Sequence, residues 1–135
     1  MLGLSVGALL WQSVHALLNH DSAWIVYGTN VLLDGGRLYK DVFELNPPLI
    51  FWITVPPVWY ARLFDISNVL AFQWYVAVLI VATVSAIWKL PIAMGVWQKR
   101  GAIVCFLFAL GFYVAGDFGQ REHLLLVFAL HYLVL

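Results

Sequence analysis

Two carboxylic acids beside apolar segments are the residues of this sequence best placed for chemistry. Asp21 directly follows one apolar run and Glu122 directly precedes another. An ionisable side chain at the edge of a membrane is costly unless it is paired or functional. Two carboxylates that converge there can supply a general base, bind a divalent metal ion, or do both. The competing interpretation is that Asp21 only caps a helix and that Glu122 only pairs with a neighbouring cation.

Cations near the two acids are candidates for binding an anionic substrate. Arg121 and His123 flank the second acid, and Lys40 lies in the polar stretch that follows the first. Such side chains can hold a phosphate group, although they can also be charges that only end a helix or face water. We expect Asp41 and Glu44 to be loop charges rather than catalysts. The sequence contains no P-loop, GxSxG, HExxH or dinucleotide-binding motif.

The composition is that of a membrane protein. Hydrophobic residues make up 64% of the chain and charged residues 10%, which excludes an ordinary soluble domain. The net charge of zero indicates no polybasic surface for nucleic acid or anionic lipid. A single cysteine, Cys105, excludes an internal disulfide and a cysteine-based metal cluster. We therefore expect an all-α polytopic membrane protein.

The apolar runs predict about four transmembrane helices and two juxtamembrane helices. The last run rises only ~18 Å, which is too short to cross a bilayer, so we expect an N-terminal fragment of a larger protein. The expected order is a membrane helix over 1–19, an extracytoplasmic loop with two surface helices over 20–68, a membrane helix over 69–88, a basic cytoplasmic loop over 89–100, a membrane helix over 101–115, an outer loop over 116–123 and a truncated membrane helix over 124–135.

The first surface helix has recognisable start and stop signals. Asp21 or Ser22 is expected to cap it, and it should end near Leu33, before Gly35 and Gly36. Its aromatic residues share one face, which is typical of a helix that lies along a membrane surface.

The segment 47–63 decides the topology. It contains four prolines as well as tryptophan and tyrosine, and proline pairs interrupt the helical hydrogen bonds whereas these aromatics favour the membrane interface. We expect a juxtamembrane helix, with a full crossing as the alternative. Without a crossing, the basic residues of 89–100 are cytoplasmic, as the positive-inside rule requires, and Asp21 shares the outer face with 117–123. With a crossing, the two polar clusters lie on opposite faces.

The polar stretch also resembles a known family pattern. It looks like the first extracytoplasmic loop of the GT-C glycosyltransferases, in the branch of the protein mannosyltransferases and the lipid A aminoarabinose transferases. The motifs that carry the resemblance are Asp21-Ser22-Ala23-Trp24, then Leu33-Asp34-Gly35-Gly36-Arg37-Leu38-Tyr39-Lys40-Asp41-Val42-Phe43-Glu44, then Asn46-Pro47-Pro48-Leu49.

The resemblance implies an integral enzyme of the bacterial inner membrane that moves a sugar from a polyprenyl-phosphate donor to a hydroxyl acceptor on the extracytoplasmic side. Asp21 would be the general base of an inverting attack, and Glu122 would match the family's second acid. Many members have lysine where this chain has Asn46, so Lys40 or Arg121 would contact the donor phosphate instead. No nucleic acid is implied, and a divalent metal is possible.

The alternative function is that of a non-enzymatic small membrane protein, either an accessory subunit or a transporter fragment. An ion pathway places charged residues in the middle of membrane helices, and the main apolar runs contain none. This observation counts against a transporter but not against an accessory subunit. As a fragment, the chain is expected to be inactive alone.

Overall fold

The computed structural model describes residues 18–45, 47–89, 94–111 and 121–134. Within these ranges the chain is helical and forms no strand, which confirms the all-α prediction. The expected membrane helix over 1–19 lies outside the described residues except for its last two positions. The helices are α2 (His20–Leu33), α3 (Leu49–Phe64), α4 (Asn68–Lys89), α5 (Val96–Gly111) and α6 (Arg121–Val134).

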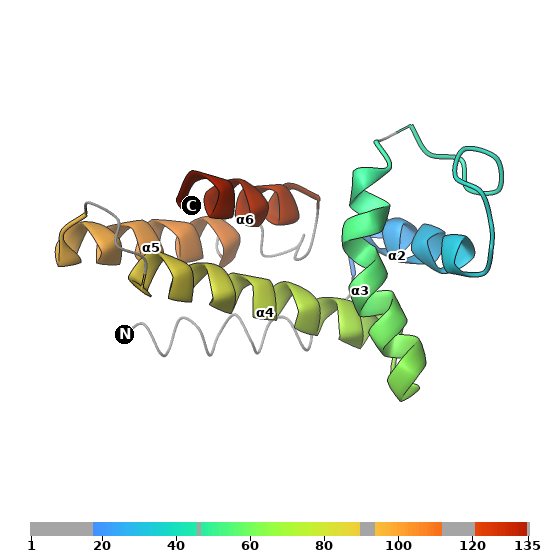
Figure 1. Cartoon of the computed structure of the whole chain (residues 1–135), viewed down its shortest axis with the longest axis horizontal. Helices are drawn as coiled ribbons and strands as arrows, with labels where there is room; N and C mark the ends of the chain where they lie inside the picture. The colour runs from blue at the N-terminus through green and yellow to red at the C-terminus, as the bar shows by residue number, and fades with distance from the viewer. Residues whose placement is uncertain (1–17, 46, 90–93, 112–120, 135) are drawn as a thin grey trace.

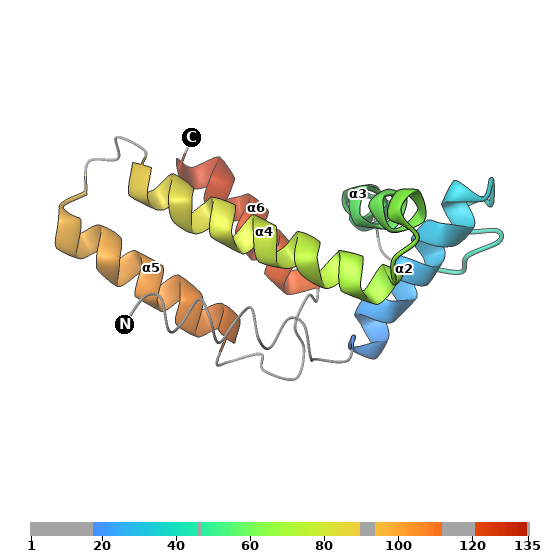
Figure 2. The ribbon, with the colours of Figure 1, turned by 90° about the horizontal axis from the view of Figure 1, so that it is seen from below.

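The helices form an elongated group with a crosspiece at one end. α4, α5 and α6 lie side by side, with α5 running opposite to the other two (Figure 1). α3 lies across the beginning of α4, and α2 packs beside α3 at that same end (Figure 2). α4 and α6 therefore both begin at the end of the molecule that carries α2 and α3.

A continuous apolar core joins the crosspiece to the long helices. The cluster contains residues from every helix of the described part: Val26, Val58, Phe72, Val76, Ile80, Ile87, Ile103, Phe106, Leu107, Leu124 and Val127. A smaller cluster of Ile25, Val42 and Phe51 packs the loop after α2 against α2 and α3. Burial of these side chains is the main force that sets the angle between the crosspiece and the long helices.

One helix of the described part, α4, is long and apolar enough to cross a membrane. Its 22 residues extend about 33 Å at ~1.5 Å per residue, which matches a hydrocarbon core of ~30 Å. This result is consistent with the expected membrane helix over 69–88.

The prediction that 89–100 is a loop is wrong at its end. α5 begins at Val96, so Lys99 and Arg100 are helical. The start is stabilised locally, because the Gly95 N–H donates to Gln98 Oε1 over 2.8 Å and the Lys99 N–H donates to the Gly95 carbonyl over 3.0 Å. No residue in this turn prevents helix formation.

The expected outer loop over 116–123 is also too long. α6 begins at Arg121, so Glu122 and His123 belong to its first turn and do not precede it. Polar residues are tolerated in a first turn because its backbone N–H groups have no partner within the helix.

The N-cap of α2 is Asn19, so the prediction of Asp21 or Ser22 is wrong. The Asn19 side chain accepts a hydrogen bond from the Asp21 N–H over 3.1 Å, as asparagine commonly does at this position. The predicted end is confirmed, since α2 stops at Leu33 and Gly35 has a φ of +89°, which favours glycine.

The helix expected over 47–63 is confirmed: α3 spans Leu49–Phe64 and continues through its internal prolines, Pro56 and Pro57. The two prolines remove two backbone donors from the helical hydrogen bonds. However, Phe51, Val58 and Ala61 are buried on both sides of the prolines at helical spacing. Continuous packing against α2 and α4 therefore maintains the helix.

Candidate functional site

Asp21 lies in the first turn of α2, and α2 belongs to the crosspiece at one end of the molecule (Figure 2). Its side chain is 52% exposed, and one carboxylate oxygen lies 3.7 Å from Nδ1 of the exposed His20. The capping bond from Asn19 uses the Asp21 backbone rather than the carboxylate. The acid is therefore open to solvent on the surface of α2, where it can receive a proton from an incoming hydroxyl group.

Glu44 is a second acid that lies against α2, and it belongs to the loop after that helix, as expected. Its Oε2 accepts a 2.9 Å hydrogen bond from the indole Nε1 of Trp24, and its Oε1 accepts the Leu45 N–H over 2.9 Å. Trp24 lies one turn after Asp21, so the two residues are neighbours along the helix surface. No sequence pattern of hydrophobicity could reveal this contact across 20 residues.

The loop between α2 and α3 is folded. The Arg37 N–H and Nε both donate to Asp41 Oδ2, over 2.8 and 3.2 Å, and the Tyr39 N–H donates to the Val42 carbonyl over 2.9 Å. These bonds neutralise one cation and one acid locally. Lys40 lies between Arg37 and Asp41 in the sequence, and its side chain is exposed. Among the described residues it has no ion-pair partner. It can therefore reach a ligand in solution.

Arg62, near the end of α3, is an important residue that sequence reasoning missed. Its guanidinium donates to Asp34 Oδ1 over 2.7 Å and to the Asn30 carbonyl and Oδ1, each over 2.9 Å. The Asn30 carbonyl also accepts the Asp34 N–H over 3.0 Å, so Arg62 adds a second hydrogen bond at the end of α2. This arginine joins the ends of α2 and α3 across about 30 residues of sequence.

The predicted residues of the second cluster belong to the first turn of α6. The backbone of Arg121, Glu122 and His123 lies at the end of the molecule that carries α2 and α3 (Figures 1 and 2). Their side chains lie outside the part of the chain that is described. The fold thus brings the starts of α2 and α6 to one end, which is the arrangement that a shared site requires.

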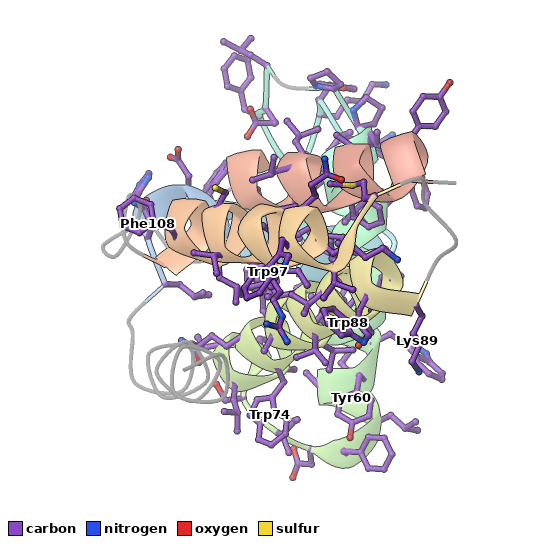
Figure 3. All side chains as sticks on the ribbon, turned by 90° about the vertical axis from the view of Figure 1, so that its left-hand side faces the viewer. Tyr60, Trp74, Trp88, Lys89, Trp97 and Phe108 are labelled. Atoms are coloured by element: carbon purple, nitrogen blue, oxygen red, sulfur yellow. The ribbon has the colours of Figure 1, made fainter. Side chains whose placement is uncertain are left out.

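An apolar groove lies between α3 and α4 beside this end. Its volume is about 500 Å³, within the ~300–1,000 Å³ common for small-molecule sites. Figure 3 shows Tyr60 of α3 and Trp74 of α4 on this side of the molecule. The groove is lined by Pro56, Pro57, Tyr60, Ile66, Leu70, Ala71, Trp74, Tyr75 and Val78. Such a lining suits a hydrocarbon chain.

The outward face of α3 is apolar and aromatic. Its exposed residues lie three or four positions apart, except for the adjacent pair Trp59 and Tyr60: Leu49, Trp52, Pro56, Trp59, Tyr60 and Leu63. Trp52 is 66% exposed, although burying a tryptophan side chain contributes strongly to stability. A contiguous stripe of this kind marks an interaction surface, and its tryptophan and tyrosine content is typical of helices at a membrane interface.

The described residues contain no group of three or more histidine, cysteine, aspartate or glutamate side chains that could hold a metal ion. The divalent metal therefore stays a prediction. The described site offers the solvent-exposed carboxylate of Asp21, the carboxylate of Glu44 bonded to an indole, and the exposed ammonium group of Lys40. An apolar groove lies beside them.

Comparison with protein-family models, with characterised proteins and with solved structures gives no match.

Proposed function

We propose that this chain carries the catalytic face of a GT-C-type membrane glycosyltransferase. The enzyme would transfer a sugar from a polyprenyl-phosphate donor to a hydroxyl acceptor on the extracytoplasmic side of the membrane. The observation that carries the proposal is the position of α2 and α3 across the end of the long helices, with Asp21 at the end where α6 begins.

The topology that accompanies this proposal has four membrane helices: the N-terminal segment, α4, α5 and α6. In it α2 and α3 lie along the outer surface of the bilayer. The apolar, aromatic face of α3 supports this position, because such faces insert at the boundary between headgroups and acyl chains. The near-perpendicular placement of α3 on α4 supports it further (Figure 1).

The proposed reaction is a single displacement. Asp21 removes the proton of the acceptor hydroxyl, whose oxygen forms a bond to the anomeric carbon of the donor sugar. The bond between that carbon and the phosphate oxygen breaks, and the phosphate leaves with the electron pair. Lys40 and Arg121 are the proposed cations that stabilise this leaving group. Holding the two substrates in line supplies a further part of the rate gain.

The groove between α3 and α4 supports a lipid-linked donor. Its apolar lining can bind the first isoprene units while the phosphate and sugar extend toward the end of the molecule that carries Asp21 and Lys40. A water-soluble nucleotide-sugar donor would leave these apolar side chains exposed, and it would gain nothing from them.

The test is sugar transfer in membranes from cells whose chromosomal gene carries Asp21→Asn, Asp65→Asn or no change. Asp65 is a matched control, because it is an exposed aspartate at the end of α3 and asparagine tolerates its positive φ of 52°. With labelled polyprenyl-phosphate mannose or aminoarabinose as donor, we expect Asp21→Asn to lower the rate by about 10²–10⁴-fold. The control should retain the unmodified rate.

Two results would contradict the proposal. Unmodified turnover in Asp21→Asn would remove the general base. Equal transfer in membranes with and without the gene, for every lipid-linked sugar supplied, would remove the enzymatic function itself.

A further inference from the structure

The charges of the chain are unevenly distributed between its two ends, although the net charge is zero. Five of the seven acids lie between residues 21 and 65, and no acid occurs from 66 to 116. This acid-free interval contains three of the seven basic residues, Lys89, Lys99 and Arg100. The end where α4 stops and α5 starts is therefore positively charged. A net charge of zero predicts no surface for anionic lipids, but it does not reveal this separation of charges along the chain.

An apolar cavity lies directly beside these cations. It is open to the surface between α4 and α5, has a volume of about 270 Å³ and is lined by Val84, Ser85, Trp88, Lys89 and Ile103. The volume is just below the ~300–1,000 Å³ of typical small-molecule sites, so a segment of one acyl chain is a better fit than a bulky ligand. Lys89 is the charged residue of the lining, at the last position of α4.

Contacts hold the other two cations at the same end. Lys99 Nζ donates to the Trp88 carbonyl over 3.3 Å, which joins the start of α5 to the end of α4. The guanidinium carbon of Arg100 lies 5.0 Å from the centre of the Trp97 ring, and an arginine stacked in this way can still donate hydrogen bonds from its edge. Figure 3 looks onto this end of the molecule and labels Trp88, Lys89 and Trp97.

We propose that this end binds an anionic glycerophospholipid, with one acyl chain in the α4–α5 cavity and the phosphate among Lys89, Lys99 and Arg100. The site and the lipid have the same arrangement of polarity. In the protein an apolar cavity adjoins three cations, and in the lipid an acyl chain adjoins a negatively charged headgroup. Clusters of basic residues beside a membrane helix are known to attract anionic lipids. The inference is independent of glycosyl transfer, since the proposed catalytic site lies at the opposite end.

The test measures lipid binding to the purified full chain in detergent by native mass spectrometry. The probes are phosphatidylglycerol and phosphatidylcholine with identical acyl chains. We expect phosphatidylglycerol to bind about tenfold more tightly, because each nearby cation strengthens the attraction to an anionic headgroup. The triple variant Lys89→Gln, Lys99→Gln, Arg100→Gln should lose this preference, whereas the matched control Arg37→Gln, which removes an exposed cation from the loop after α2 at the opposite end, should keep it.

A second variant tests the cavity separately from the charges. Ser85→Phe fills the cavity between α4 and α5 and leaves all three cations in place, so it should weaken the binding of both lipids and keep the preference between them. Circular dichroism checks that each variant stays helical. Equal binding of the two lipids to the unmodified chain would overturn the proposal, as would a retained preference in the triple variant. Polyprenyl phosphate that displaces phosphatidylglycerol at one tenth of the phosphatidylglycerol concentration would also overturn the proposal, because it would assign the site to a different lipid.

Discussion

Arg62 shows how much one side chain contributes to the geometry of the site. It donates to Asp34 and to two oxygens of Asn30, so it neutralises an acid and caps the end of α2 at the same time. Only a planar guanidinium can supply several donors in these directions. Arg37, by contrast, pairs with Asp41 inside a single loop, where both side chains are largely exposed.

Replacing the two arginines should therefore have different effects on stability. We expect Arg62→Gln to lower the free energy of unfolding by about 1–3 kcal/mol, because hydrogen bonds to a charged group are lost across two helices. Arg37→Gln should cost less than about 1 kcal/mol, as exposed ion pairs do. Thermal unfolding followed by circular dichroism in one detergent compares the two. Equal shifts in the midpoint would show that Arg62 does not join the helices.

The packing of α2 on α3 depends on the absence of a side chain at Gly28. A Cβ atom there would lie 2.6 Å from Phe51 Cε1 and 3.1 Å from Val42 Cγ1. Phe51 is completely buried, so its ring has little room to move away. The close approach of these two helices places the loop that carries Lys40 and Glu44 against α2.

Gly28→Ala should consequently destabilise the protein by about 1–3 kcal/mol, the usual cost of overpacking a core. The matched control is Gly101→Ala in α5, where a Cβ meets nothing within 4 Å and alanine is the better helix former by about 1 kcal/mol. Adding Phe51→Leu to Gly28→Ala should restore part of the loss. Thermal unfolding measures all three, and an unchanged midpoint for Gly28→Ala would contradict the proposed tight contact.

At the scale of the whole molecule, the five acids between residues 21 and 65 and the aromatic face of α3 lie at one end, and the cations of α4 and α5 lie at the other. This distribution agrees with the positive-inside rule if α4 runs from the outside to the inside. It also requires that the loop before α3 and the connection after it lie on the same side of the membrane.

Cysteine labelling in intact cells tests this topology. In a Cys105→Ser background, single cysteines replace Lys40, Ser67 or Gln98, which lie in exposed positions of the loop, the α3–α4 connection and α5. A membrane-impermeant maleimide should label the first two and should label Gln98→Cys only after the cells are opened. Labelling of Lys40→Cys and Ser67→Cys from opposite sides would show that α3 crosses the membrane.

The accuracy of the sequence predictions followed the range of the interactions involved. The end of α2 was predicted correctly because Gly35 determines it locally, and the apolar length of α4 is visible directly in the sequence. The predicted start of α5 is too late, because charged residues do not by themselves indicate a loop, and Lys99 and Arg100 are compatible with a helix. The roles of Arg62 and Glu44 depend on partners 20 to 32 residues away, and no local pattern contains them.

The sequence by itself determined the helical class, the strongly apolar character and the polar residues available for chemistry, because these properties follow from side-chain hydrophobicity and local backbone preference. Only the tertiary structure decided that α3 lies across α4 and that α2 and α6 begin at the same end of the molecule. The physical reason is that burial of Phe51, Val58 and Phe72 depends on how distant segments pack. That packing energy outweighs the local penalty of the prolines.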